Sequence, residues 1–133
     1  MPSRIQTLTP SNLPSPLGPY SHIARAGQLI TISAIAGMDP ESGKIVSADA
    51  YSQAKQILRL CDVMLEAAGS DFAHVVHVNV FLKNMEHLEE VSRAYDDVVG
   101  AHGPAGTVVA VSDLPKRDAL VTMSLTAVAH QRG

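Results

Sequence analysis

Hydrophobic and polar positions alternate along the C-terminal third of the chain, and this alternation predicts two β-strands there. The runs Thr107–Val111 and Leu120–Ala129 are rich in Val, Thr and Leu, and β-branched residues suit a pleated surface. In the second run one face is apolar and consists of Val121, Met123, Leu125, Ala127 and Ala129. The other face carries mostly small hydroxyl groups, a composition that suits a cleft or a wet subunit interface better than a dry core.

Four further runs predict strands in the first two thirds of the chain. We expect a short edge strand at Arg4–Leu8, and a hairpin in which the turn Gly27-Gln28 joins His22–Ala26 to Leu29–Ala36. The valine-rich run His74–Leu82 gives the strongest strand signal. In the two longest of these runs, alternation predicts an apolar face formed by Ile30, Ile32, Ala34, Val76, Val78, Val80 and Leu82.

Two amphipathic runs predict helices. In Ala48–Ala68, helical spacing gives one apolar stripe, with Ser47 or Asp49 as the N-cap and Gly69 as the left-handed residue after the helix. The members of this stripe are Ala54, Ile57, Leu58, Cys61, Met64, Leu65 and Ala68. The second helix is expected at Asn84–Val99, with its inward positions at Leu88, Val91, Tyr95 and Val98.

The predicted order β-β-β-α-β-α-β-β indicates an α+β fold with one sheet and two helices. Two helices cover one face of a sheet of five or six strands and leave the other face bare. We place on this open face Thr31, Ser33, Val75, His77, Asn79, Phe81, Thr107, Val109, Thr122, Ser124 and Thr126. Such a face is too apolar for water and too polar for a monomer core, so it predicts homo-oligomerisation, with clefts between subunits at its rim.

Length and composition set further bounds. A chain of 133 residues and 14.1 kDa predicts a single domain spanning residues 1–133. A net charge of −3 with ten scattered basic residues argues against nucleic acid as a partner. The single cysteine excludes an internal disulfide, and no run reaches the length of a membrane span, so we expect a cytoplasmic protein. The six histidines form no recognised metal motif, and we expect no metal and no cofactor.

Several short motifs occur in one order between Leu17 and Ala129. They are Leu17-Gly18-Pro19-Tyr20-Ser21, Gly27–Ser33, Asp39-Pro40 with Gly43, Gln53, Glu66–Gly69, Asp71–Leu82, Tyr95, Pro104-Ala105, Val111 and Leu114-Pro115. As an ordered set they resemble the RidA family, also called YjgF or L-PSP, the reactive intermediate deaminases. The resemblance implies a chorismate-mutase-like fold and a homotrimer with three clefts between subunits. For typical members it also implies hydrolysis of enamine and imine intermediates released by pyridoxal-phosphate enzymes.

The chain departs from the family pattern at positions that carry the chemistry. Gly106 stands where deaminating members have an arginine that clamps the substrate carboxylate, and Thr122 where they have a water-orienting glutamate. Ser92 replaces the asparagine of the second helix. Each lost hydrogen bond to a charged group costs about 1.5–3 kcal/mol, and a threonine hydroxyl is no general base near neutral pH. The resemblance therefore predicts an altered deaminase site.

The candidate site residues follow from this comparison. The catalytic candidates are Tyr20 and Thr122, and the substrate-binding candidates are Tyr20, Ser33, Ser92, Gly106, Thr107 and Arg117. Four of them have a structural alternative: Tyr20 packs beside the proline loop, Ser33 and Thr122 are ordinary strand hydroxyls, and Arg117 is a solvated charge rather than a substitute clamp. His22 is expected to be an exposed strand histidine, with a replacement acid-base group as the alternative.

Two classes of function remain open from the sequence. The first is an enzyme that acts on a small imine, enamine or related carbonyl compound without an arginine-bound carboxylate. The second is a non-catalytic trimer that binds a small metabolite in the same clefts. A nuclease ranks third, because the sequence offers neither metal ligands nor a basic track.

Overall fold

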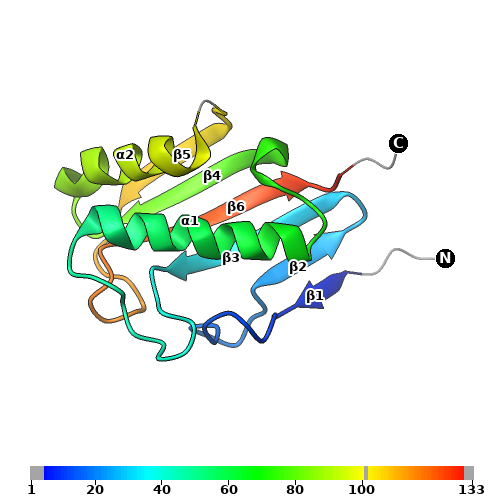
Figure 1. Cartoon of the computed structure of the whole chain (residues 1–133), viewed down its shortest axis with the longest axis horizontal. Coiled ribbons are helices and arrows are strands. Elements are labelled where there is room, and N and C mark those ends of the chain that lie inside the picture. The colour runs from blue at the N-terminus through cyan, green and yellow to red at the C-terminus, as the bar shows by residue number, and fades with distance from the viewer. Residues whose placement is uncertain (1–4, 101, 131–133) are drawn as a thin grey trace.

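The computed structural model describes residues 5–100 and 102–130, which form one six-stranded sheet and two α-helices (Figure 1). The order of strands across the sheet is β1-β2-β3-β6-β4-β5. The elements are β1 (Gln6–Leu8), β2 (Ile23–Ala26), β3 (Leu29–Ala36), α1 (Ala50–Ala67), β4 (Val75–Leu82), α2 (Leu88–Val99), β5 (Ala105–Ala110) and β6 (Val121–Val128). Short 3₁₀ turns at Phe72–His74 and Met85–His87 precede β4 and α2. All the predicted strands and helices are confirmed, although Arg4 of the expected first strand lies outside the described residues.

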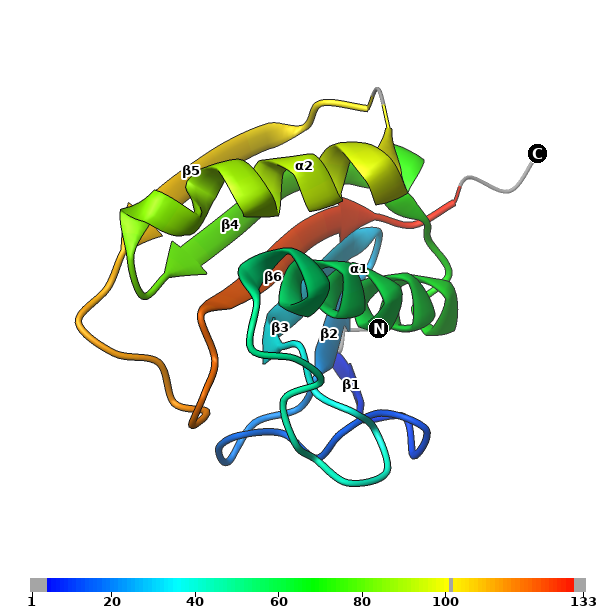
Figure 2. The same ribbon diagram turned by 60° about the vertical axis from the view of Figure 1, so that its left-hand side comes forward.

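The sheet is mixed, as the fold class requires. β4 and β5 pair in parallel, while every other neighbouring pair of strands is antiparallel. The parallel pair follows from the chain path, because α2 carries the chain back across the sheet between β4 and β5. Both helices lie on the same face, α1 over the middle of the sheet and α2 over β4 and β5 (Figure 2). The opposite face is left open.

Helix α1 buries the stripe that its spacing predicts. All seven predicted positions are buried, and Cys61 is a core residue whose thiol pKa is raised to about 12 by burial and by the nearby Asp62. The N-cap is Asp49, whose carboxylate accepts a hydrogen bond from the Ser52 N–H. Gly69 adopts a φ of 81° just after the helix, the left-handed conformation that glycine favours.

Helix α2 differs from the prediction at one inward position. Val91 is buried and Tyr95 is half-buried, but Val98 is exposed and Ala94 is fully buried instead. The cause is that α2 packs against α1 as well as against the sheet, which turns the buried stripe toward Ala94. A small side chain at this position lets the two helices approach closely.

Two β-bulges overturn part of the predicted alternation. In β4 the register shifts between Val75 and His77, so Val75 is 2% exposed and Val76 is 47% exposed, the reverse of the prediction. In β3 it shifts between Ile32 and Ile35, so Ile35 is buried where Ala34 was expected. An extra residue in one strand reverses the facing of its neighbours, and sequence alternation alone does not reveal it.

The open face has the mixed character that the sequence predicts. Leu29, Val109 and Val128 are exposed on it, and every residue of the edge strand β5 is exposed. Polar side chains bond across strands between them: His77 Nε2 lies 3.1 Å from Thr107 Oγ1, and the Asn79 amide donates to Ser124 Oγ over 3.2 Å. Within residues 5–100 and 102–130, neither helix combines the length and hydropathy of a membrane span.

Candidate functional site

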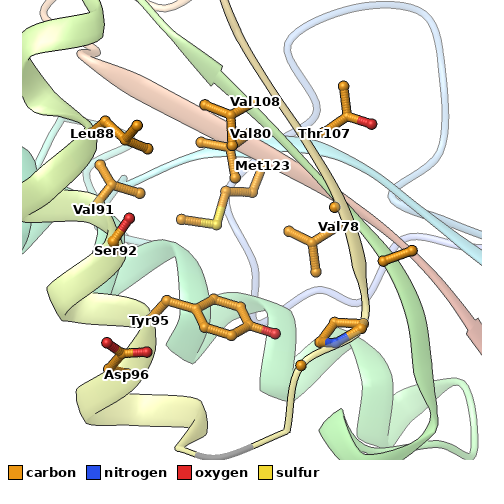
Figure 3. Close-up of a pocket in the computed structure, with 14 residues that line it drawn as sticks. Val78, Val80, Leu88, Val91, Ser92, Tyr95, Asp96, Thr107, Val108 and Met123 are labelled. Atoms are coloured by element: carbon orange, nitrogen blue, oxygen red, sulfur yellow. The ribbon is translucent and has the colours of Figure 1, made fainter.

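A cavity of about 240 Å³ lies between α2 and the parallel strands β4 and β5 (Figure 3). Its apolar walls come from β4, α2, β5 and β6 and consist of Val78, Val80, Leu88, Val91, Val108 and Met123. Residues 103–107, which lead into and begin the edge strand β5, line another side. The cavity is thus a small, mostly apolar space with few polar groups, the usual character of a small-molecule site.

Gly106 helps to leave this space empty. It pairs with Val78 in the parallel ladder, so its missing side chain would point to the helix-covered face. A Cβ at Gly106 would meet only the Val78 carbonyl oxygen, at 3.6 Å, which is ordinary van der Waals contact. The φ of Gly106 is outside the left-handed region. A side chain at this position is therefore compatible with the backbone.

Tyr95 and Asp96 are the ionisable groups of the cavity. Tyr95 projects from α2 into the space opposite Val78, and its buried hydroxyl has no hydrogen-bond partner among the described residues (Figure 3). Burial raises the pKa of Tyr95 above its usual value of 10, so the hydroxyl stays protonated at neutral pH. The Asp96 side chain is exposed, and among the described residues the lining includes no lysine or arginine. The described lining is therefore unsuited to an anion, and it offers the Tyr95 hydroxyl as a buried hydrogen-bond donor without a partner among the described residues.

Three of the predicted binding residues meet at this cavity. Ser92 lies on α2, while Gly106 and Thr107 lie on β5. The Thr107 hydroxyl bonds to His77 on the open face, so Thr107 contributes its backbone to the cavity. Sequence reasoning did not single out Tyr95 and Asp96 as site residues, although helical spacing had already placed Tyr95 inward.

Tyr20 and Ser33 lie elsewhere and form a second group. The Ser33 hydroxyl donates to the Ser21 carbonyl over 2.7 Å, and the Ser33 N–H donates to the His22 carbonyl over 2.9 Å. Tyr20, next to this anchor, is exposed. The prediction that His22 is exposed is wrong: it is buried, and its Nε2 lies 2.5 Å from the Pro14 carbonyl oxygen, because the proline loop folds over it.

Thr122 is poorly placed to touch a ligand in the single chain. It is 3% exposed and pairs with Ala36 on one side and Phe81 on the other. Ser124 lies two residues further on the same face and is half-buried. Of the two hydroxyls, that of Ser124 is therefore the more accessible.

Arg117 belongs to a different hollow. This wide, open space is lined by the β5–β6 connection and by residues 45–48, and Lys83 forms an ion pair there with Asp113 over 3.4 Å. The Leu114 N–H and then Lys83 lower the pKa of the Asp113 carboxyl. Arg117 is exposed and does not line the cavity at Gly106 within one chain.

Comparison with known proteins relates this sequence and fold to a defined group. Residues 10–129 match the family model described as Endoribonuclease L-PSP. A RutC family protein from Pyrococcus horikoshii is 36% identical over 120 residues, 90% of this chain and 93% of that protein. The human 2-iminobutanoate/2-iminopropanoate deaminase is 34% identical over 111 residues, 84% of this chain and 81% of that protein. The crystal structure of the YjgF gene product of E. coli matches with a TM-score of 0.86 and 29% identity, covering 94% of this chain and 99% of that one.

Proposed function

Because the chain belongs to the Endoribonuclease L-PSP family, the family of the RidA and YjgF proteins, we propose that it is a RidA-like homotrimer acting on small imines, enamines or related carbonyl metabolites that lack a carboxylate. The observation that carries this proposal is the apolar cavity at Gly106. A glycine stands there in place of the expected clamp, and the nearest ionisable groups are a neutral tyrosine and a carboxylate. The proposed clefts lie between subunits, and the protein is proposed to be cytoplasmic.

The arrangement of the candidate residues supports assembly. Ser92 and Gly106 line the cavity, whereas Tyr20 and Ser33 lie apart from it near the β2–β3 hairpin. A second copy packed against the open face and the β5 edge would be one way to join the two groups. The exposed aliphatic side chains on that face favour such burial. Light scattering of the native protein should then give three times the chain mass of 14.1 kDa, and a monomer would contradict the proposed assembly.

The negative charge of Asp96 at the cavity favours a substrate without a carboxylate. Asp96 would repel a substrate carboxylate, and no lining cation among residues 5–100 and 102–130 would offset that repulsion. Asp96 would not repel a neutral imine or its protonated form. The Tyr95 hydroxyl can donate a hydrogen bond to the imine nitrogen or the carbonyl oxygen of such a molecule.

Hydrolysis of an imine needs few catalytic groups beyond those that line the cavity. Water adds to the C=N carbon and one of its protons goes to the nitrogen; the proton of the new hydroxyl then also passes to the nitrogen as the C–N bond breaks, which releases ammonia and leaves a carbonyl compound. Tyr95 would hold the nitrogen end of the substrate, and the apolar walls would fix its alkyl part near the attacking water. Because the described lining offers no strong general base, the attacking water would add without one. We therefore expect only a modest enhancement of the rate of imine hydrolysis.

The same features also fit the alternative, a non-catalytic trimer that binds a small carbonyl metabolite. It is favoured because the part of the lining that the structure describes includes no histidine or lysine to act as a base, and only the exposed carboxylate of Asp96. The two functions share the ligand class and differ only in turnover, so one assay separates them.

The test compares imines with and without a carboxylate. An amine oxidase acting on propylamine supplies an alkyl imine, and threonine dehydratase supplies 2-iminobutanoate. Semicarbazide traps each imine that has not been hydrolysed. We expect the protein to shorten the lifetime of the alkyl imine and to leave that of 2-iminobutanoate unchanged. Saturable binding of propanal without faster hydrolysis would favour the binding function, and faster hydrolysis of 2-iminobutanoate alone would overturn the proposed substrate class.

A further inference from the structure

A second cluster of chemically active side chains lies away from the cavity, where β6 ends beside the connection from α1 to β4 (Figure 1). Asp71 Oδ1 lies 2.7 Å from His74 Nδ1, and Asp71 Oδ2 lies 2.8 Å from His130 Nε2. The two imidazole rings meet edge to face with their centroids 5.0 Å apart. One carboxylate thus stands between two imidazoles that come from distant parts of the chain.

The backbone holds these three residues together without help from their side chains. The His130 N–H donates to the Gly69 carbonyl over 2.9 Å, and the buried Ser70 hydroxyl donates to the Val128 carbonyl over 2.6 Å. The His74 N–H donates to the Asp71 carbonyl over 3.1 Å. These hydrogen bonds hold the end of β6 against residues 69–71 without any bound ligand. The three side chains are therefore preorganised.

We propose that Asp71, His74 and His130 form a site for a divalent transition-metal ion, with Zn²⁺ favoured over Mg²⁺ and Ca²⁺. One ligand atom from each residue lies within 4.8 Å of the others. Ligands about 2.0–2.1 Å from one Zn²⁺ ion stand roughly 3.3 Å apart in a tetrahedron, so small side-chain rotations suffice. Two imidazoles and one carboxylate suit Zn²⁺, whereas Mg²⁺ and Ca²⁺ prefer oxygen ligands.

The surroundings leave space for the remaining coordination positions. All three side chains are partly exposed, and an open hollow borders His74 and His130 next to Gln28 and Ala129. Water can therefore complete the shell of a bound ion. The site shares no residue with the cavity at Gly106, so it stands independently of the proposed function.

The sequence predicts no metal site, and the reason is topological. Asp71 and His74 are three residues apart, a spacing that carries little information alone, and His130 becomes their neighbour only because β6 runs antiparallel beside β4. The fold supplies the third ligand.

Isothermal titration of the untagged, chelator-treated native protein with ZnCl₂ tests the site, with MgCl₂ in parallel. We expect one Zn²⁺ per chain with micromolar affinity and no measurable heat with Mg²⁺. Co²⁺ in place of Zn²⁺ should give the visible absorption of a four- or five-coordinate ion. His130→Gln and His74→Gln should each weaken Zn²⁺ binding by about 100-fold, because even indirect supporting groups are worth about 10–100-fold.

A matched control is available at the start of α2, where His87 is the N-cap residue. His87 Nδ1 lies 3.5 Å from Glu90 Oε1, again a carboxylate and a histidine three residues apart, but the described residues give this pair no second histidine. His87→Gln should leave Zn²⁺ affinity unchanged. Circular dichroism melts without metal confirm that each variant is folded. Zn²⁺ affinity weaker than millimolar in the native protein, or a loss caused by His87→Gln equal to that caused by His130→Gln, would overturn the proposal.

Discussion

Gly106 and Val78 lie opposite each other in the parallel β4–β5 ladder, and a Cβ on Gly106 would stand 3.6 Å from the Val78 carbonyl oxygen. This relationship leaves room for a longer side chain in the cavity. The φ of Gly106 also lies outside the left-handed region, so the backbone imposes no strain on a substitution. The backbone around Gly106 is therefore compatible with an arginine at this position.

Gly106→Arg should give the cavity affinity for a carboxylate. A hydrogen-bonded charged pair is worth about 1.5–3 kcal/mol, so 2-oxobutanoate should bind about tenfold to a hundredfold more tightly than to the native protein. Titration calorimetry measures the gain, and Gly106→Gln supplies a side chain of similar length without charge. Hydrolysis of 2-iminobutanoate should stay slow, because tighter holding does not deliver water. Equal affinities for the arginine and glutamine variants would contradict the placement of Gly106 at the ligand.

Thr122→Glu should destabilise the protein rather than create a base. Thr122 is 3% exposed between Ala36 and Phe81, and a buried, unpaired carboxylate costs several kcal/mol. We expect the free energy of unfolding in guanidinium chloride to fall by about 3 kcal/mol. Ser124→Glu, on the same face but half-buried, should cost less. A Thr122→Glu protein as stable as the native one would show that this part of the open face is accessible to water.

Tyr95→Phe should separate stability from ligand binding. The Tyr95 hydroxyl is buried without a partner among the described residues, and such a group costs about 1–3 kcal/mol. Its removal should leave the free energy of unfolding unchanged or raise it, while the affinity for propanal falls. Tyr51→Phe is the control, because the Tyr51 hydroxyl donates to Asp97 over 2.6 Å at the surface, and its loss should lower stability slightly. A clear loss of stability in Tyr95→Phe would mean that the hydroxyl has a partner in the assembled protein.

Asp49→Ala should lower the stability of the native protein by about 1 kcal/mol at pH 7, because the Asp49 carboxylate caps α1. The Ser47 hydroxyl and then the Ser52 N–H lower the pKa of this carboxyl from 3.8 to about 2. A group with a lowered native pKa stabilises fully above its unfolded pKa and loses that effect as pH falls toward the native value. Denaturant melts should therefore show the difference between Asp49→Ala and native protein narrowing between pH 4 and pH 2. Asp62→Ala, an exposed change on the same helix, is the control for the loss of one negative charge away from the cap.

The sequence predicts the positions of the helices and strands well, but it predicts less well which side chains of each element are buried. The stripe on α1 is visible because seven apolar residues recur at helical spacing, and each of them is buried. The sequence does not reveal that Val75 is buried in place of Val76, or Ile35 in place of Ala34. Both changes come from bulges, and a bulge depends on the register with β6 and not on local composition. The burial of Ala94 is not predicted either, because it depends on the packing of α2 against α1.

The candidate site shows the same division. Ser92, Gly106 and Thr107 meet at one cavity, as motif order leads one to expect. Tyr20 and Ser33 do not reach that cavity, since their contacts are with the β2–β3 region of the same chain. The Asp71–His130 contact joins residues far apart in the chain, and only the strand topology makes them neighbours. Local patterns predict what each element contributes, whereas contacts between elements require the fold.

The most direct test of a cavity without a carboxylate clamp compares two ligands that differ only in that group. Amide cross-peaks of Ser92 and Gly106 in ¹⁵N spectra of the native protein report on occupation of the cavity, during titration with propanal and with 2-oxobutanoate. We predict saturable shifts of both peaks with propanal, and weaker or no shifts with 2-oxobutanoate. Tighter binding of 2-oxobutanoate at these two peaks would contradict the account, because another group of the assembled protein would then supply the clamp.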